Sequence, residues 1–357
     1  MTTNACPRKR FLTAKKKLKL GFWNVRTISQ LSKTEQVIKQ MIQYKIDILA
    51  LSEVRWTGMG EKRIDKEHTS IYSGNNATRD QGVALLLTNV PTQAMIIWTP
   101  VSSPIITARF LGSHAKLSIV ACYAPTNEAS TEDKQSFYNE LAGVFKDIPR
   151  HDVLCLLGDL NAKIGNDYTF CPEVFGKHGI GERNDNGELL IDFALLHDLV
   201  IGGSLFPRPD THKYSWTSPD GQMRNQIDHC LINRKWRSSL QDVRAYRGAD
   251  VGSDHNLIIA TILLKLKKHT RKCPLPAKPL FASAKLKDNE MKTLFSVELS
   301  NKFETLALPE DIDCETIWES MKSCCQEVAE STIGYRPKLN DEWLSQKTWD
   351  LIAKGKS

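Results

Sequence analysis

The sequence has no Cys-x-x-Cys pair, no long apolar run and no internal repeat, and each absence excludes a class of protein. Its nine cysteines are odd in number, so we expect buried free thiols rather than a zinc site or a disulfide framework. No apolar run approaches the roughly 18 residues that cross a bilayer. The charged N-terminus lacks the apolar segment of a secretion signal. We therefore expect an intracellular protein without a membrane partner.

Positive charge is concentrated in two segments. Residues 1–20 carry seven basic side chains and no acidic one, which equals the whole net charge of +7. Residues 265–292 carry nine basic and two acidic side chains. A near-neutral body between basic segments allows nucleic-acid binding. We expect a nuclear protein, with the cytoplasm as the alternative. The first segment either serves import or phosphate binding, or is a solvated tail.

The chain divides by composition into a large domain and an appendage. We expect a basic disordered arm over residues 1–17, one domain over 18–264 and a basic, proline-containing linker over 265–283. The appendage, residues 284–357, contains three helical patterns with little apolar area to share. It is interpreted as weakly folded or as an element that binds a protein partner.

Apolar runs separated by Gly, Pro and Asn predict many strands and few helices in the large domain. The strands are expected over residues 18–24, 46–51, 70–72, 83–87, 94–98, 105–110, 117–123, 153–157, 200–203, 214–217, 226–232, 243–246 and 257–264. A capping box from Ser32 to Glu35 predicts the start of one helix. Two more helices are expected over residues 132–145 and 188–197. This pattern predicts packed sheets with helices outside.

Polar side chains stand where several of these apolar runs end. Asp159 and Asn161 follow the run Val153–Leu157 and lie two residues apart, so in an extended chain they face the same way. The other members of this set are Asn24, Glu53, Tyr123, Asp228, Asp254 and His255. Any single Asp or Asn is more often a cap or turn residue, and a single Tyr or His more often packs. Only the whole set indicates a functional site.

The chemistry of this set favours phosphoester hydrolysis. Several carboxylates with amides and without cysteine ligands suit Mg²⁺, with Mn²⁺ as a substitute, better than zinc. His255 paired with Asp228 would fix an imidazole tautomer, although His229 is a competing candidate. A metal, a positioned water and hydrogen-bond donors for the developing charge are the components of phosphoryl transfer.

Six ordered motifs resemble the endonuclease/exonuclease/phosphatase family, which includes DNase I and the apurinic endonucleases. They are Trp23-Asn24-Val25, Ser52-Glu53, Tyr123-Ala124-Pro125, Gly158-Asp159-Leu160-Asn161, Ile227-Asp228-His229 and Ser253-Asp254-His255. The resemblance implies a four-layer α/β sandwich of two packed mixed β-sheets flanked by helices. The amino-acid sequence is also similar to the endonuclease region of RTE-type non-LTR retrotransposons and the related craniofacial development protein 2 group, over residues 21–27, 52–58, 226–229 and 247–250.

The resemblance implies a role for each polar residue. Glu53 would be a metal ligand, with Asn24 and Asp254 near the metal. Arg26 stands where the apurinic endonucleases have an acidic residue, so a second metal position and strong abasic-site activity are not implied.

Five further residues take catalytic roles in the same comparison. Asp159 would orient or deprotonate the attacking water, and His255, paired with Asp228, would donate to the scissile phosphate. Asn161 and Tyr123 would hold that phosphate. Both Asp159 and His255 stay candidates for the base.

Three side chains are candidates for DNA contact. A hairpin over residues 217–225, which carries Arg224 and the turn Pro219-Asp220-Gly221, stands where retrotransposon endonucleases place a variable loop against DNA. The alternative is an exposed hairpin without contact. Arg55 and Trp56 either contact DNA or pack beside Glu53.

The sequence thus predicts a Mg²⁺-dependent DNA endonuclease, derived from a non-LTR retrotransposon, that nicks DNA and leaves a 3′-hydroxyl. A phosphatase acting on a small phosphoester, such as an inositol phosphate, is one alternative. A catalytically inactive, domesticated scaffold that binds nucleic acid or chromatin proteins is the other. Because the chain shows no Asp-Asp polymerase motif before Ser357, we expect a truncated or domesticated element product that cannot copy its template.

Overall fold

A computed structural model describes residues 10–28, 31–79, 81–266, 280–306 and 314–335 of the chain. The chain forms two compact units, Met1–Lys267 and Lys268–Ser357. The first unit holds two large sheets and all residues predicted for the site.

The first sheet has seven strands in the order β14-β15-β1-β2-β5-β4-β3. β1 and β2 are parallel, and their neighbours pair antiparallel. The strands are β1 (Leu18–Asn24), β2 (Ile48–Ser52), β3 (Met59–Arg63), β4 (His68–Ser73), β5 (Val83–Thr88), β14 (Leu240–Tyr246) and β15 (Leu257–Ile262).

The second sheet has six strands in the order β10-β13-β9-β8-β7-β6, with β8 and β9 parallel. The strands are β6 (Met95–Ser102), β7 (Ile105–Phe110), β8 (Leu117–Tyr123), β9 (Val153–Asp159), β10 (Leu199–Ile201) and β13 (Asp228–Asn233). A separate hairpin pairs β11 (Trp216–Thr217) with β12 (Arg224–Asn225). It confirms the hairpin predicted from the turn at residues 219–221.

The helices of this unit are α1 (Leu31–Tyr44), α2 (Asn89–Ala94), α3 (Thr131–Asp147) and α4 (Asp185–Leu196), with short 3₁₀ helices at Gly202–Ser204, Asp210–His212 and Arg234–Ser239. Sequence features explain where α3 begins. Ser130 is the N-cap and accepts from the Asp133 amide, while Glu132 and Asp133 complement the positive end of the helix dipole. Phe137, Leu141 and Phe145 recur four residues apart and are buried together.

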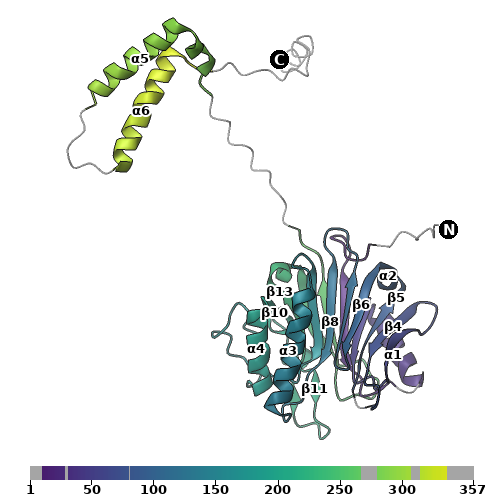
Figure 1. The fold of residues 1–357 in the computed structure, drawn as a ribbon. Helices are drawn as coiled ribbons and strands as arrows, with labels where there is room; N and C mark the ends of the chain where they lie inside the picture. The colour runs from purple at the N-terminus through teal and green to yellow at the C-terminus, as the bar shows by residue number, and fades with distance from the viewer. Residues whose placement is uncertain (1–9, 29–30, 80, 267–279, 307–313, 336–357) are drawn as a thin grey trace, which may run out of the picture. The chain divides into compact units, whose positions relative to one another are not determined.

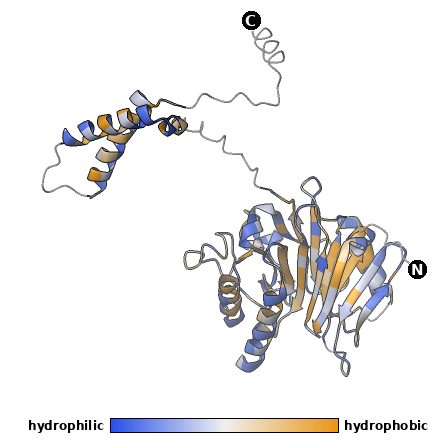
Figure 2. Cartoon of the chain, turned by 45° about the horizontal axis from the view of Figure 1, so that its top comes forward, coloured by the Kyte–Doolittle hydropathy of each residue, from blue (hydrophilic) through white to orange (hydrophobic). Residues whose placement is uncertain are grey.

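Three apolar clusters hold the unit together as four layers. One cluster, which includes Leu20 and Ile258 from the first sheet and Ile119 from the second, fills the space between the sheets. A second lies between the second sheet and α3 with α4, and a third between the first sheet and α1. Figure 1 shows α1 on one side of the sheets and α3 with α4 on the other. In Figure 2 the strands at the centre are predominantly hydrophobic. The predicted four-layer sandwich is confirmed.

Three local predictions were wrong. Ser32 lies inside α1 rather than capping it, because the helix begins at Leu31. The strand β3 was missed because its sequence, MGEKR, is mostly exposed and has no apolar pattern. The disordered arm was predicted over residues 1–17, but Phe11 and Leu12 are buried against the core, and Phe11 donates its amide to Leu111.

The topology brings distant polar residues to one edge. Parallel β1 and β2 both end there, as do parallel β8 and β9 in the other sheet. β15 runs antiparallel to β1 and β13 antiparallel to β9, so their first residues lie at the same edge. Residues before or after these strands therefore meet although they are up to about 230 positions apart in sequence.

The second unit contains a 3₁₀ helix (Ser283–Lys287), α5 (Asn289–Glu304) and α6 (Cys314–Thr332). Its buried apolar residues include Cys324 and Val328, whereas the Trp318 side chain on α6 is 60% exposed. The helix predicted over residues 341–354 lies outside the described residues. Among the helices that the structure describes, none combines the length and the apolar character that crossing a bilayer demands.

Candidate active site

Asn24 connects carboxylates from two sheets. Its side chain is buried at the end of β1. Nδ2 donates to Glu53 Oε1 at 2.8 Å and to Asp159 Oδ2 at 2.9 Å, and Oδ1 accepts from the Arg26 amide at 3.1 Å. Three of the predicted site residues are therefore held by one amide.

Asp159 is buried at the end of β9. Burial, reinforced by the charge of Asp228, raises the pKa of the Asp159 carboxyl, although His255 and the Asn24 hydrogen bond act in the opposite direction. A carboxyl with a raised pKa accepts a proton more readily than an ordinary aspartate. Asp159 is therefore suited to general-base chemistry.

His255 and Asp228 form the predicted pair. His255 Nδ1 lies 3.0 Å from Asp228 Oδ2, and Nε2 lies 3.7 Å from Asp159 Oδ2. Burial disfavours the imidazolium, but the Asp228 and Asp159 carboxylates outweigh it and raise the pKa of His255 to about 9. The imidazole is therefore protonated at neutral pH and can donate a hydrogen bond through Nε2.

Glu53 follows β2 and is mostly buried between donors. Oε1 accepts from Asn24, and Oε2 accepts from Arg55 Nη2 at 3.2 Å. The Tyr123 hydroxyl also bonds to Glu53, and burial together with this charge raises the pKa of Tyr123 far above its ordinary value. Tyr123 therefore stays a neutral donor at any physiological pH.

Asn161 lies two residues after the end of β9. Its backbone amide donates to Asp159 Oδ1 at 3.1 Å, and its Nδ2 donates to the Ala124 carbonyl at 2.9 Å. Asn184, the N-cap of α4, donates to the Asn161 carbonyl at 3.1 Å and accepts from the Lys163 amide at 2.8 Å. The loop that holds Asn161 is thus fixed by the first turn of α4.

Strained backbone is concentrated at this edge. Arg26, Glu53, Arg55 and Asn161 have φ of 46°, 51°, 57° and 49°, in the left-handed region that non-glycine residues rarely adopt. Each such residue costs about 1–3 kcal/mol and persists only where its surroundings hold it. Their grouping around Asn24 and Asp159 is independent support for a functional site.

Asp254 has one occupied and one unpartnered oxygen. Oδ2 accepts from Arg26 Nη1 at 3.2 Å and from Trp216 Nε1 at 3.1 Å. Oδ1 is buried, with no hydrogen-bond partner among the described residues. An orphaned carboxylate oxygen of this kind is a fitting ligand for a cation or a water.

The residues present fit a divalent metal. Oxygen or nitrogen atoms of Asp159, Asp228 and His255 all lie within 4.8 Å of one another. Because His255 is protonated and paired with Asp228, the ligands that remain are carboxylates, and Asp159, Glu53 and Asp254 line the site pocket together. Oxygen-rich donors of this kind are the ligands that hard cations prefer. The grouping differs from the predicted metal set of Glu53, Asn24 and Asp254, which stays a prediction.

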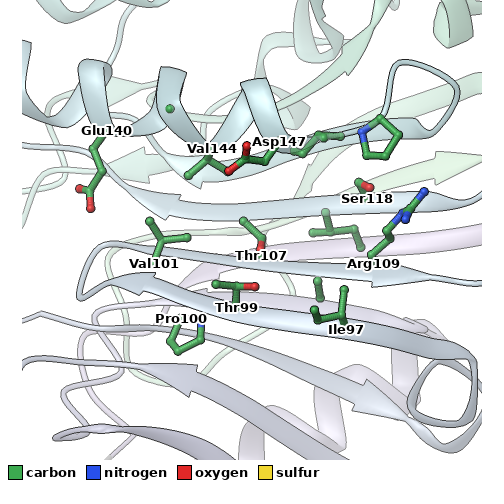
Figure 3. A pocket seen from close by; sticks show the side chains of 15 residues that line it. Ile97, Thr99, Pro100, Val101, Thr107, Arg109, Ser118, Glu140, Val144 and Asp147 are labelled. Atoms are coloured by element: carbon green, nitrogen blue, oxygen red, sulfur yellow. The ribbon is translucent and has the colours of Figure 1, made fainter.

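We define the site pocket as the cavity of about 390 Å³ lined by Asn24, Arg26, Glu53, Tyr123, Thr126, Asn127, Glu128, Asp159, Asn161, Lys163, Asn184, Trp216, Asn225, Ile227, Asp254 and His255. A larger groove of about 750 Å³ lies between the outer face of β6 and β7 and the helix α3 (Figure 3). No histidine lines that groove, and Asp152, which pairs with its Arg109, is buried beneath it. The chemistry therefore belongs to the smaller pocket.

The structure places the other candidates as follows. Trp56 donates Nε1 to the Ile28 carbonyl and packs edge-on against Tyr72, so it has the packing role that was one of its two predicted roles. Arg55 forms an ion pair with Glu53. Arg224 is exposed on the hairpin. His229 is buried, with Nε2 2.7 Å from the Ala162 carbonyl, and points away from the His255 pair. Contact of Arg55, Trp56 or Arg224 with DNA stays a prediction.

Several pocket residues are absent from the predicted site set, among them Trp216, Lys163 and Asn184. Trp216 stood in a predicted strand, whereas Lys163 and Asn184 stood in neither a predicted strand nor a predicted helix. Asn184 carried a usable signal, since an asparagine shortly before an apolar helix is a typical N-cap. Trp216 carried none, because only tertiary packing brings it to Asp254. Lys163 carried only its position two residues after Asn161.

Comparison with known proteins gives sequence relatives and structural neighbours. Craniofacial development protein 2 of Tragulus javanicus is 40% identical over 248 residues, which span 70% of this chain but 42% of that protein. The endonuclease domain of TRAS1, a telomere-specific non-LTR retrotransposon, superposes with a TM-score of 0.51 at 15% identity, covering 70% of this chain and 100% of that domain. The 3′ phosphatase NExo from Neisseria, bound to product DNA hairpin, superposes with a TM-score of 0.52 at 21% identity. The match covers 69% of this chain and 99% of the NExo chain.

The family model gives the assignment. The model described as the Endonuclease/Exonuclease/phosphatase family matches residues 21–255, which include every polar residue of the site from Asn24 to His255. The two structural neighbours share the fold of this unit. Because the family model covers well over half of the chain, the protein belongs to the endonuclease/exonuclease/phosphatase family.

Proposed function

We propose that the protein is a Mg²⁺-dependent endonuclease that nicks DNA and leaves a 3′-hydroxyl. The observation that carries the proposal is one pocket in which Asp159 with a raised pKa faces a protonated His255, within reach of Glu53 and Asn24. Such an arrangement supplies both proton acceptor and proton donor to a phosphodiester. The alternatives, a phosphatase of small phosphoesters or an inactive scaffold, become outcomes of the test.

The residues divide the chemistry between them. Asp159 accepts a proton from the attacking water, and Asn24, which donates to both Asp159 and Glu53, fixes the orientation of that carboxylate. His255 donates Nε2–H to a non-bridging phosphate oxygen, and Asp228 keeps the imidazole charged and oriented. Tyr123 and Asn161 also line the site pocket, and we assign them to hold the same phosphate.

Glu53 and Asp254, with the Asp159 carboxylate in the same pocket, are the residues that would hold Mg²⁺. The metal would neutralise charge on the phosphate and lower the pKa of a coordinated water. Mn²⁺, which prefers similar oxygen ligands, is expected to substitute.

Three observations support DNA as the substrate. Basic segments over residues 1–20 and 265–292 supply phosphate-binding charge, and the exposed hairpin with Arg224 lies beside the pocket through Trp216 and Asn225. The TRAS1 domain is an endonuclease of a non-LTR retrotransposon, and NExo was bound to a DNA hairpin. Descent from such an element and a nuclear location are part of the proposal.

The test is conversion of supercoiled plasmid to the nicked form. We expect nicking with Mg²⁺, none with EDTA, and a loss of about 10²–10⁴-fold in Glu53→Gln and His255→Ala. Glu61→Gln, which changes an exposed carboxylate on β3, is the matched control and should nick at the parental rate. End-labelling of the nick should reveal a 3′-hydroxyl.

Two results would contradict the proposal. Turnover of a soluble phosphoester that needs Glu53, without nicking of plasmid, would favour the phosphatase. Folded protein that binds DNA but hydrolyses neither substrate would favour the scaffold.

A further inference from the structure

Arg26 contributes a guanidinium to the lining of the site pocket, and its side chain is 51% exposed. It follows Asn24 by two residues, at the point where the chain turns away from β1 with φ of 46°. Its backbone amide donates to Asn24 Oδ1, so the base of this arginine is tied to the same amide that orients Asp159 and Glu53.

Charge in the pocket explains why an arginine is needed there. Four carboxyl side chains line the pocket against two basic side chains and His255; they are Glu53, Glu128, Asp159 and Asp254 against Arg26 and Lys163. An approaching phosphodiester, itself an anion, meets repulsion from these carboxylates at short range. The half-exposed Arg26 side chain brings a positive charge to this pocket, which can offset the repulsion.

Arg26 is aimed by a fixed partner. Asp254 Oδ2 accepts from Nη1 of Arg26 at 3.2 Å and, on its other side, from Trp216 Nε1 at 3.1 Å. Trp216 is itself held because β11 runs beside residues 254–256: Thr217 donates its amide to the Asp254 carbonyl, and Asn256 donates to the Ser215 carbonyl. A guanidinium has five N–H donors in a planar fork, so one bond to Asp254 leaves others for a phosphate.

We propose that Arg26 binds a phosphate of the DNA at the mouth of the site pocket, with Asp254 and Trp216 as the positioning residues that aim its guanidinium. The inference deepens the proposed function and rests on it, because it assigns one substrate contact of that same site. The inference also gives the hairpin a role, because its residue Trp216 holds Asp254, and Asp254 in turn holds the Arg26 guanidinium.

The experiment measures DNA affinity without catalysis. The full chain is titrated in EDTA against a fluorescein-labelled DNA duplex, and anisotropy is followed over a range of salt concentrations. We expect Arg26→Gln to weaken binding roughly tenfold, as for loss of a charged hydrogen bond. The slope of log K against log salt should shrink by about 0.9, the value for one phosphate contact. Arg26→Lys should retain the slope and recover part of the affinity.

The matched control is Arg234→Gln. Arg234 is also an exposed arginine paired with an aspartate, Asp198, at 2.7 Å, but it follows the far end of β13. This variant removes the same charge and should leave the affinity and the slope close to those of the parent. Circular dichroism of each variant confirms that it is folded.

A second pair of variants tests the positioning role. Trp216→Phe removes the Nε1 donor to Asp254 and keeps an aromatic ring. It should weaken binding in the parent but not in Arg26→Gln, since the indole acts through Arg26. An equal loss in both backgrounds would overturn that role. An unchanged slope in Arg26→Gln, with the parent still binding DNA, would overturn the inference alone, whereas a parent that does not bind DNA would overturn the proposed function with it.

Discussion

At the scale of single residues, the site is a balance between buried charges of opposite sign. Asp159 and Asp228 would repel each other if both were ionised without His255 between them, and His255 would lose its proton on burial without the two carboxylates. Asn24 contributes a hydrogen bond that favours the ionised form of Asp159. Proton transfer in the pocket therefore depends on the group as a unit rather than on any one member.

This coupling predicts a bell-shaped pH dependence. Activity that needs ionised Asp159 and protonated His255 should rise with pH through the raised Asp159 pKa and fall as the pH passes about 9, where His255 loses its proton. In Asp228→Asn a charge that raises both pKa values is gone, so both limbs should move to lower pH. The measurement is kcat/KM for nicking as a function of pH.

The control for this prediction is another Asp–His pair. Asp65 lies 2.9 Å from His68 Nδ1 at the β3–β4 turn, remote from the pocket in sequence and topology. Asp65→Asn should leave the profile unchanged. An alkaline limb that stays in place in Asp228→Asn would refute the assigned cause of the His255 pKa.

At the scale of elements, β8 and β9 must approach closely to place Asp159. Gly158 precedes Asp159, and a Cβ at this position would lie 2.5 Å from the Cys122 carbonyl oxygen and 2.7 Å from Cys122 Sγ. Both contacts are with a fully buried neighbour on the adjacent strand. Glycine is required here by the distance between strands rather than by its backbone angles.

A pair of glycine substitutions tests this close approach. Gly158→Ala should lower the free energy of unfolding by about 1–3 kcal/mol, the range for overpacking, and should reduce nicking because Asp159 moves with it. Gly143→Ala in α3 should raise the free energy of unfolding by about 0.5–1 kcal/mol, because an added Cβ meets nothing within 4 Å and helix interiors favour alanine. Urea denaturation measures both, and a Gly158→Ala protein as stable as its parent would contradict the argument.

At the scale of the whole molecule, the chain has two compact units, and the site pocket belongs to the first. The first unit has its own core clusters and holds the whole site pocket. The second unit leaves Leu294, Val297 and Trp318 about half exposed or more, and a protein partner for it stays a prediction. Because every residue that lines the site pocket belongs to the first unit, we expect the proposed nicking activity to persist without the second.

Truncation after Leu266 tests this separation. We expect the shortened chain to retain the parental thermal unfolding midpoint of the first unit and the parental nicking rate at low salt. DNA affinity should fall, because most of the basic segment over residues 265–292 is removed. A lowered unfolding midpoint would show instead that the second unit stabilises the first.

The sequence by itself determined the layered fold and most members of the site. Short, near-continuous apolar runs such as Val153–Leu157, bounded by turn residues, favour strands covered on both faces, and the polar residues that end them are expected to leave the core together. β7 and β8 have the predicted bounds because their apolar runs end at clear turn signals. The exposed strand β3 and the buried residues Phe11 and Leu12 had no such pattern and were assigned wrongly.

Only the tertiary structure decided how the site residues pair. Sequence spacing alone does not show which histidine, His255 or His229, pairs with Asp228. It also does not show that Asp254 accepts from both Arg26 and Trp216. These contacts join residues up to 228 positions apart, and their geometry depends on sheet register and loop packing. The physical reason is that local patterns encode which face of a strand is buried, whereas the partner across a pocket is set by how two sheets pack.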